Sequence, residues 1–474
     1  MSTFRKENLQ ILIEMSTFAK EKMRKRICLL KGDSTIMMKQ LKAMWKGLLT
    51  MAFAIAVFMV CIFPYRALMN YHEQRHLFRW NIYYFQEQCT GLDGLCEYVV
   101  SWMTQFFYIG WLGAAVIAVL AVAIQQAIWL IFRLIRINKA IVYPFTFIPS
   151  ILLFYYVFIP QEYKDDSQFR EAVEYDYLVR ARKWNRILGK SYNHPPETMN
   201  GIWCTNYALG MKGMLLDDMF YYKQDGPDGL LMDALRIHPL ALYSLSDISF
   251  EIGMINSAER FAFDVKQRLP DNHKSGRIYQ RLAEANLVNG HYKIARRYMH
   301  VLQSTLFYGR WANHYLAILG DEQAIDNDAR YGALRLKRQK QNDQLMYAKD
   351  QILAQLVEEN PKNKLAADYL LAYTMLRLDL EKVTDYTLRL KDKVYQHVPK
   401  AVQESIAGYW ILSHPNDSLP MPISKEIFQT TASYFSIVNK TGNMFDPSLD
   451  VPPYKQSYWH YHTQATVKLK QQRP

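Results

Sequence analysis

The sequence predicts an all-α protein in which three transmembrane helices precede a solenoid built from pairs of helices. Three long apolar runs, all in the first third of the 474-residue chain, have the length needed to cross a bilayer. Beyond residue 160, apolar residues recur every three or four positions, and one helical segment is repeated further along the chain. Together these features predict a membrane anchor followed by an exported helical domain.

The apolar runs cover residues 47–65, 104–132 and 140–160, and we expect each to span the membrane. Each is close to or longer than the roughly 20 residues that a transmembrane helix needs. The first two contain no charged residue, which disfavours the alternative of buried core helices in a soluble protein. The first run offers no small-residue cleavage site, so we expect an uncleaved anchor and a membrane region over 47–160.

Basic residues flank these runs unevenly. Residues 1–46 hold eleven Lys and Arg against four Asp and Glu, and the link between the second and third runs carries Arg133, Arg136 and Lys139. Cytoplasmic flanks of membrane helices are enriched in Lys and Arg, so both regions are predicted to be cytoplasmic. The loop 67–103 and everything after the third run then lie on the opposite side.

The net charge of +13 is explained by this topology and by attraction to anionic lipid. No basic-aromatic nucleic-acid motif accompanies the charge, so no nucleic-acid partner is expected. The sequence also contains no P-loop, G-x-S-x-G or dinucleotide fingerprint. The lipid bilayer is therefore the first partner that the sequence predicts.

Two segments of the exported part, residues 238–270 and 276–307, match when Ala258 is aligned with Ala295. Each combines a first helix, a tight turn such as the one at Gly290, and a second helix built around the aligned alanine. Small residues let paired helices approach closely, and the turn favours Gly or Asn. The pattern is that of a tetratricopeptide-like α-solenoid, in which Ala258, Gly290 and Ala295 are packing residues.

This helical repeat domain is predicted over residues 161–412. A further unit follows where Pro361 and Pro399 each precede a new helix, a position at which the missing amide proton costs nothing. The alternative is an irregular helical bundle without true repeats. Residues 413–474, rich in Pro, Asn and Tyr, are expected to form a capping helix and an extended tail.

The loop after the first run contains His72, Glu73 and His76 in the order H-E-x-x-H, the zinc-protease signature. In a zincin the two histidines hold zinc from one helix face, and the glutamate activates the bound water. Here the charged Arg75 precedes the second histidine, no third-ligand motif follows, and the loop is too short for a catalytic domain. Zinc and a catalytic Glu73 are therefore expected only under a protease alternative.

The favoured interpretation of this segment is an amphipathic stretch at the membrane interface. Its aromatic residues would then lie at the level of the lipid headgroups, as in the aromatic belts of membrane proteins. These residues are Phe78, Trp80, Tyr83, Tyr84 and Phe85.

Cysteine and histidine pairs offer two more candidate sites. Cys89 and Cys96 bracket a Gly-rich turn, and in an oxidising compartment they would close a short disulfide; two free thiols are the alternative. His460 and His462 are two positions apart, which suits one face of a strand and a metal site. Packing inside an aromatic tail is the favoured interpretation of the histidines.

Three strings carry a resemblance to a known family: "QEQ…GLCEYVVSWMTQFFYIGWLGAAVIA" (86–118), "NYALGMKGMLLDDMFYYKQDGPDGLL" (206–231) and "GMINSAERFAFDV…RLAEANLVNGHYKIARRYMHVLQSTLFYGRWA" (253–312). They resemble an uncharacterised family of Bacteroidetes inner-membrane proteins, a domain of unknown function, over most of residues 67–412. The resemblance implies a protein of the bacterial inner membrane, with a membrane-embedded N-terminal region followed by a periplasmic repeat domain. Members of that family usually carry many more spans, so this chain looks like a short, three-span member.

From the solenoid we expect a membrane-anchored scaffold that binds an envelope protein or peptide, in a process such as envelope assembly, secretion or glycan handling. A membrane zinc metalloprotease using His72, Glu73 and His76 is one alternative. A reduced subunit of a multi-span glycan- or lipid-processing membrane enzyme is another. An enzyme is the less favoured class, and no cofactor is expected under the scaffold hypothesis.

Overall fold

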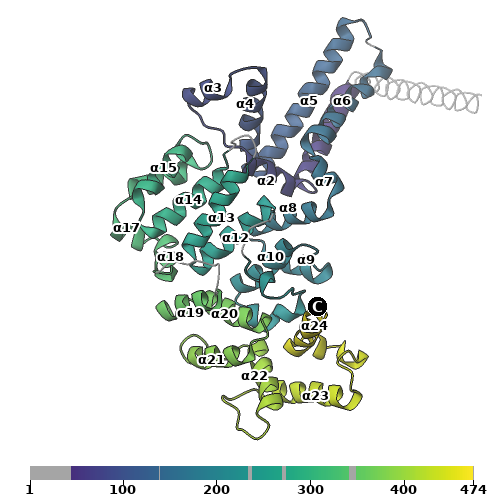
Figure 1. Cartoon of the computed structure of the whole chain (residues 1–474). Coiled ribbons are helices and arrows are strands. Elements are labelled where there is room, and N and C mark those ends of the chain that lie inside the picture. Colours follow the sequence, from purple (N-terminus) through teal and green to yellow (C-terminus); the bar gives the residue numbers. More distant parts are fainter. Residues whose placement is uncertain (1–43, 138, 233–237, 270–273, 341–348, 473–474) are drawn as a thin grey trace, which may run out of the picture. The chain divides into compact units, whose positions relative to one another are not determined.

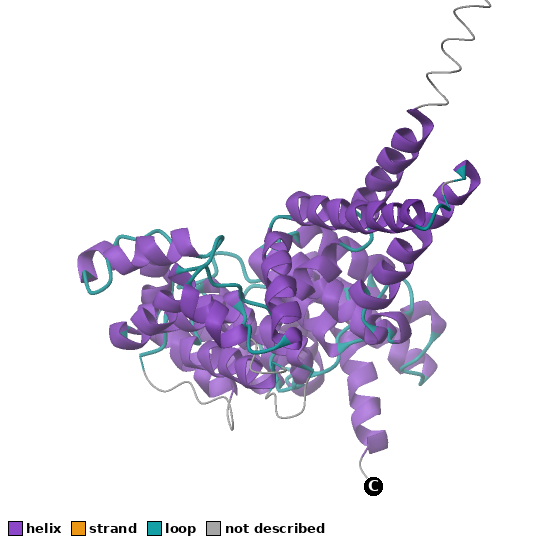
Figure 2. Ribbon diagram, turned by 90° about the horizontal axis from the view of Figure 1, so that it is seen from above, coloured by secondary structure: helices purple, strands orange, loops and turns teal. Residues whose placement is uncertain are grey.

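The regular structure of the described chain is helical (Figures 1 and 2). The computed structural model describes residues 44–137, 139–232, 238–269, 274–340 and 349–472, and within these ranges it contains no strand, as the sequence predicts. Most of the predicted basic segment 1–46 lies outside the described residues. The chain divides into two compact units, Met1–Phe63 with Ala114–Phe158 and Pro64–Gly113 with Ile159–Pro474.

Within the described part of the chain, three helices are long and apolar enough to cross a membrane. They are Met44–Ile62, α5 (Gly110–Leu134) and the continuous helical segment Ala140–Phe158, which comprises η2 (Ala140–Phe147), α6 (Ile148–Leu153) and η3 (Phe154–Phe158). They coincide with the three predicted runs, although the second begins later than expected. The reason is that Thr104 ends an earlier helix and Gln105–Tyr108 form the short 3-10 helix η1. Ile109 alone separates η1 from α5.

Polar side chains inside the first unit pair with one another. Gln125 of α5 donates a hydrogen bond to Thr146 at 2.8 Å, and the hydroxyl of Ser150 donates to the carbonyl of Ala121 at 3.0 Å. Hydrocarbon offers no hydrogen-bond partner, so polar groups in membrane helices are satisfied within the protein. These bonds therefore join α5 to the third helix.

The second unit is a series of helices connected by short turns. Its α-helices are α2 (Arg66–Arg75), α3 (Ile82–Gln88), α4 (Leu92–Thr104), α7 (Gln161–Asp165), α8 (Ser167–Arg180), α9 (Trp184–Asn193), α10 (Met199–Met211), α11 (Leu215–Asp218), α12 (Pro239–Ile252), α13 (Ile255–Arg268), α14 (Gly276–Asn289), α15 (Tyr292–Gln303), α16 (Gly309–Ala317), α17 (Glu322–Asp326), α18 (Tyr331–Lys337), α19 (Lys349–Glu359), α20 (Lys364–Leu376), α21 (Leu380–Leu390), α22 (Lys400–Ser413), α23 (Lys425–Thr441) and α24 (Tyr458–Gln472). Successive helices pack on one another from α12 to α16 and again from α19 to α23 (Figure 1).

A buried apolar cluster joins α12 to α18. Ala258 of α13 and Ala295 of α15 have no exposed surface and belong to this cluster. Larger side chains, among them Leu287, Met299 and Tyr331, fill the same space. Burial of one large apolar side chain contributes about 1.5–3 kcal/mol, so these facing stripes stabilise the helices more than intrinsic propensity does.

Two glycines end the first helices of the segments that match in sequence. Gly253 follows α12 with a φ of 107°, and Gly290 follows α14 with a φ of 79°. Both angles lie in the left-handed region, which glycine adopts without a steric penalty. Space around Gly290 is open, whereas a Cβ at Gly253 would lie 2.5 Å from the carbonyl oxygen of Lys337. Gly253 therefore also permits a close approach to the end of α18.

Gly290→Ala is expected to destabilise the chain by about 1 kcal/mol, because the added Cβ is strained in the left-handed conformation and touches nothing else. Gly253→Ala carries the same strain and must also displace the Lys337 carbonyl, so we expect at least about 1 kcal/mol more. Thermal unfolding of the full chain in detergent, followed by circular dichroism, measures both changes. Equal shifts for the two variants would contradict the close approach at Gly253.

The C-terminal region differs from the prediction of an extended tail, because Tyr458–Gln472 form α24. The indole of Trp459 donates to the carbonyl of Glu404 at 2.7 Å. A side chain at Gly408 of α22 would overlap the Trp459 ring, so the glycine provides the space that α24 occupies. The helical packing of this segment depends on α22, which its own composition does not indicate.

Candidate ligand-binding site

The H-E-x-x-H segment lies at the end of a helix. His72 and Glu73 belong to α2, but α2 ends at Arg75, and His76 follows in extended backbone with φ −129° and ψ 143°. A zincin presents both histidines from consecutive turns of one helix, which this geometry does not provide. Among the residues that the structure describes, no group of three or more His, Cys, Asp and Glu side chains could hold a metal ion.

The carboxylate of Glu73 is engaged inside the protein. Its Oε2 pairs with Arg180 at 2.6 Å, and its Oε1 accepts a hydrogen bond from the hydroxyl of Tyr308 at 2.7 Å. Arg180 also donates to Asn70 at 2.7 Å and to Tyr308 at 2.9 Å. Burial acts to lower the pKa of Arg180, but Glu73 and Tyr308 outweigh it and raise that pKa above its usual value. Glu73 therefore links α2 to α8 through a buried ion pair.

Two of the predicted interfacial aromatic residues lie in the protein core instead. Phe78 and Tyr84 are 2% and 5% exposed, so their assignment to the lipid headgroups is wrong. α2 likewise packs on α8 and buries Glu73, which is not the behaviour of an interfacial segment. Trp80, Tyr83 and Phe85 are exposed.

The other predicted pairs are placed as follows. Cys89, just after α3, and Cys96 of α4 are free thiols in this structure, and their disulfide stays a prediction.

His460 and His462 lie on α24, where positions two apart are separated by about 200° around the helix axis. A shared strand face is therefore wrong for these histidines. The ring of His462 packs 4.9 Å from that of Trp459.

Burial lowers the pKa of His462 from 6.5 to about 4. The unfolded chain keeps the ordinary value, so between these two pH values it binds more protons than the folded chain, and stability falls as the pH is lowered. We expect a loss of about 1–3 kcal/mol by pH 4. Melting temperatures of the full chain between pH 7 and pH 4 measure it. His462→Phe should reduce the slope, and an unchanged slope would contradict this assignment.

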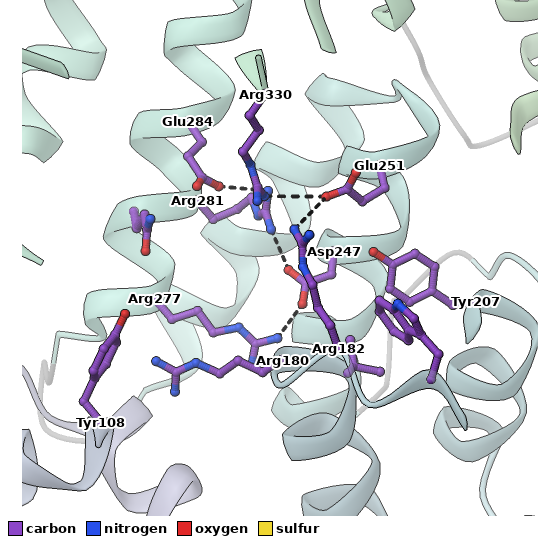
Figure 3. A pocket seen from close by; sticks show the side chains of 13 residues that line it. Tyr108, Arg180, Arg182, Tyr207, Asp247, Glu251, Arg277, Arg281, Glu284 and Arg330 are labelled. Atoms are coloured by element: carbon purple, nitrogen blue, oxygen red, sulfur yellow. Dashed lines mark hydrogen bonds and ion pairs between the residues drawn. The ribbon is translucent and has the colours of Figure 1, made fainter. Parts of the chain in front are cut away.

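The principal candidate site is a polar pocket of about 310 Å³ in the second unit (Figure 3). Its walls come from η1, the end of α8, α9, α10, α12, α14 and the residue before α18. Its charged lining consists of Arg180, Arg182, Arg277, Arg281, Arg330, Asp247, Glu251 and Glu284. Its aromatic lining consists of Tyr108, Trp184 and Tyr207.

Helical spacing brings the charges of two helices onto facing surfaces. Asp247 and Glu251 are four positions apart on α12. On α14, Arg277 and Arg281 are four positions apart, and Glu284 follows three positions later. Residues three, four and seven apart share one helix face. Asp247 and Glu284 are 37 positions apart. The two matching sequence segments, aligned on Ala258 and Ala295, are offset by the same number of positions.

The buried floor of the pocket is a network of ion pairs. Arg277 pairs with Asp176 at 2.8 Å and with Asp247 at 2.6 Å, and Arg281 pairs with Asp247 at 2.7 Å and with Glu284 at 2.9 Å. Burial acts to raise the pKa of Asp247, but the two arginines outweigh it and hold that pKa below its usual value. Asp247 therefore stays charged and paired with the two arginines at neutral pH, and the network of ion pairs forms the structural base of the site.

The rim is paired more loosely. Arg182 and Arg330 are 58% and 41% exposed, and both approach the same oxygen of Glu251, at 3.9 Å and 3.5 Å. These distances are longer than those of direct hydrogen bonds. A second carboxylate placed between the two guanidinium groups would give each a short, charge-assisted partner.

The network contains equal numbers of positively and negatively charged side chains, but they are unevenly distributed between its floor and its rim. The floor holds three arginines (Arg180, Arg277, Arg281) and four carboxylates (Glu73, Asp176, Asp247, Glu284), whereas the rim holds two arginines and Glu251. The floor therefore sums to −1 and the rim to +1. The positive end of the pocket is the end that contains the most exposed arginines.

The backbone of Arg182 is strained, with a φ of 50°. Its N–H donates to the carbonyl of Val179 at 2.9 Å, and the N–H of Lys183 donates to Leu178 at 2.9 Å. These bonds form a Schellman cap, whose left-handed residue is usually glycine because a Cβ costs about 1–2 kcal/mol there.

None of the pocket residues was predicted from the sequence. A usable signal is the pair of charges at four-residue spacing, Asp247 with Glu251 and Arg277 with Arg281, on helices that are otherwise largely apolar. Arg330 carries no such signal, because it lies in a turn and reaches the pocket only through the packing of α18 on α14.

Comparison with known proteins gives one match. The model of a family of unknown function (DUF6057) matches residues 41–164 and 158–465. No curated protein and no solved structure matches the chain. The two matched stretches together include all three candidate membrane helices and every residue of the pocket.

Proposed function

The chain belongs to the family of unknown function DUF6057, and because that family supplies no activity to transfer, we propose that the chain is a membrane-anchored scaffold that binds an acidic segment of an envelope protein. The observation that carries the proposal is the pocket rim, where Arg182 and Arg330 share the single carboxylate of Glu251. A carboxylate of the partner would lie between these two arginines.

The proposed topology has three spans, with the helical domain in the periplasm of a bacterial inner membrane. One compact unit contains both Pro64–Gly113 and Ile159–Pro474, and Glu73 pairs with Arg180 inside it. This supports a topology in which the loop after the first span and the domain after the third lie on the same side. The basic link between α5 and the third helix then lies in the cytoplasm, as the positive-inside rule expects.

The scaffold is proposed to act through tetratricopeptide-like helix pairs. Gly253 and Gly290 are 37 positions apart and have the same left-handed conformation, and Ala258 and Ala295, also 37 positions apart, are both fully buried. In such stacks the first helices of successive pairs line the binding groove. Here the first helices α12 and α14 contribute five of the eight charged residues of the pocket.

Site-specific photo-cross-linking in native membranes tests the proposal. We would place p-benzoylphenylalanine at Gln280, which lines the pocket, and at Ile294, an exposed residue of α15, as the matched control. The expected result is a discrete cross-linked envelope protein at position 280 and not at position 294. Combining the probe with Arg182→Glu and Arg330→Glu should abolish that product.

Metal analysis of the purified full chain separates the alternatives. About one zinc per chain, lost on His76→Ala, would overturn the scaffold proposal in favour of a metalloprotease. A large membrane protein that co-purifies regardless of the two rim substitutions would instead favour a reduced subunit of a membrane enzyme. A position-280 product that survives both charge reversals would contradict the role of the rim.

A further inference from the structure

The helices α3 (Ile82–Gln88) and α4 (Leu92–Thr104) expose an unusual amount of apolar surface. They pack against each other and form a hairpin in the second unit, which we call the α3–α4 hairpin. Its exposed large apolar residues are Ile82, Tyr83, Phe85, Leu92, Leu95, Val99, Val100 and Trp102. Leu92 and Tyr83 are 78% and 79% exposed. A cluster of apolar side chains with such high exposure is unusual on the surface of a soluble protein.

The two faces of α4 are arranged in the opposite way to those of a soluble amphipathic helix. Ser101 and Thr104 are 7% and 6% exposed and face the protein, while Leu95, Val99 and Trp102 lie on the exposed side. Residues spaced by three and four share a helix face, so the apolar residues form one continuous stripe. The stripe is therefore directed away from the protein that supports the helix.

The inward side of the hairpin is held firmly. The ring of Tyr98 lies 5.0 Å from Phe78 and 5.3 Å from Phe85, and the ring of Tyr84 lies 5.6 Å from Phe78. Asn81 caps α3 by accepting a hydrogen bond from the N–H of Tyr84 at 2.7 Å. The exposed stripe therefore belongs to an ordered element with its own small aromatic core.

Continuity along the chain identifies what covers the stripe. α4 runs directly into η1, and Ile109 alone separates η1 from α5, the second candidate membrane span. Two residue steps extend at most about 7 Å, so Tyr108 lies within that distance of the start of the span. Arg66, four positions after the end of the first span, donates to the carbonyl of Phe107 at 2.9 Å. The residues just after the first candidate span and just before the second are thus both connected to η1.

We propose that the α3–α4 hairpin lies in the outer leaflet interface of the bilayer, with the stripe of Leu92, Leu95, Val99 and Trp102 inserted among the lipids. The proposal rests on α5 crossing the bilayer, which is part of the proposed function. The hairpin contains the acidic residues Glu87, Asp93 and Glu97 and no Lys or Arg. Its insertion is therefore hydrophobic and should not depend on anionic lipid.

Electron paramagnetic resonance of single spin labels tests this placement. The full chain, with its five cysteines replaced, is reconstituted in nanodiscs of zwitterionic phosphatidylcholine, with or without phosphatidylglycerol. Labels at Leu95 and Val99 report the stripe, and a label at Asp93, an exposed polar residue of α4 outside the stripe, serves as the comparison within the same helix. Val119 in α5 is the lipid control, and Leu336, an exposed residue of α18, is the water control.

Labels at positions 95 and 99 are expected to be as accessible to oxygen, which concentrates in lipid, as the label at position 119. They should also be inaccessible to an aqueous nickel complex, and both results should hold in both lipid compositions. Position 93 should resemble position 336. High nickel accessibility at 95 and 99 would overturn the proposal, as would a label shielded from both reagents, which indicates contact with a second copy. Nickel access at position 119 would instead refute the membrane anchor itself.

A second measurement covers the case in which the cysteine-free chain does not fold. In the native chain, Trp102→Phe should remove part of the tryptophan emission that brominated lipids quench, because Trp102 belongs to the stripe. Trp184→Phe, which changes an indole that lines the pocket, should leave the quenchable emission unchanged. Equal effects of the two substitutions would contradict insertion of the hairpin.

Discussion

Glu73→Gln is expected to lower the free energy of unfolding by about 3–5 kcal/mol, because it breaks a buried ion pair by removing one partner. The substitution keeps the shape of the side chain but leaves the charge of Arg180 without its partner at 2.6 Å, in a site where the carboxylate is 4% exposed. The melting temperature of the full chain in detergent should fall by at least about 5 °C.

A double-mutant cycle separates the ion pair from other effects of the substitution. Arg180→Met added to Glu73→Gln should recover part of the lost stability, because it removes the charge that Glu73→Gln leaves buried. His72→Ala, on the neighbouring residue of the same signature, should cost less than about 1 kcal/mol, since His72 is only partly buried. A zinc site predicts another outcome, with His72→Ala and His76→Ala each releasing bound metal.

Arg182→Gly is expected to stabilise the chain while weakening partner binding. Glycine relieves the strained φ of 50° and should raise the free energy of unfolding by about 1 kcal/mol. The ion pair between Arg182 and Glu251 is long and exposed, so its loss should lower the free energy of unfolding only slightly. Loss of a charge-assisted bond to the partner carboxylate should reduce the cross-link at position 280 by about 10- to 100-fold.

Two control variants distinguish the two effects of Arg182→Gly. Leu378 has a φ of 61° in a cap of the same kind after α20 and does not line the pocket, so Leu378→Gly should leave the cross-link unchanged. Arg330→Gln should weaken the cross-link without any gain in stability, because its backbone is unstrained at φ −94°. Partner binding that is unaffected by both Arg182→Gly and Arg330→Gln would refute the carboxylate site.

Local sequence patterns were sufficient where local chemistry controls the structure. The three apolar runs correspond to helices that can span a membrane, because span length depends only on consecutive apolar residues. The turns at Gly253 and Gly290 were recognisable, because a left-handed helix cap selects glycine wherever it occurs. The helical class of the fold follows from the same kind of short-range periodicity.

The H-E-x-x-H segment shows where local patterns mislead. Its composition is compatible with a metal site or an interfacial stretch, yet Glu73 is buried against Arg180 and Tyr308, which are 107 and 235 positions away in the sequence. No local pattern contains that information. The exposed stripe of α4 is a similar case, since its residues look like the start of a membrane span and only the burial of Ser101 and Thr104 reveals which side faces the protein.

The helices long enough to span a membrane, the helical class and the repeated turns could thus be predicted from the amino-acid order, because each depends on residues close together in the sequence. The pocket could not, because its arginines and carboxylates come from α8, α12, α14 and the turn before α18, and their pairing depends on how those helices cross. Helix crossing is set by side-chain packing between segments far apart in the chain. Which charges pair in the buried floor, and which remain exposed at the rim, is therefore a property of the folded structure.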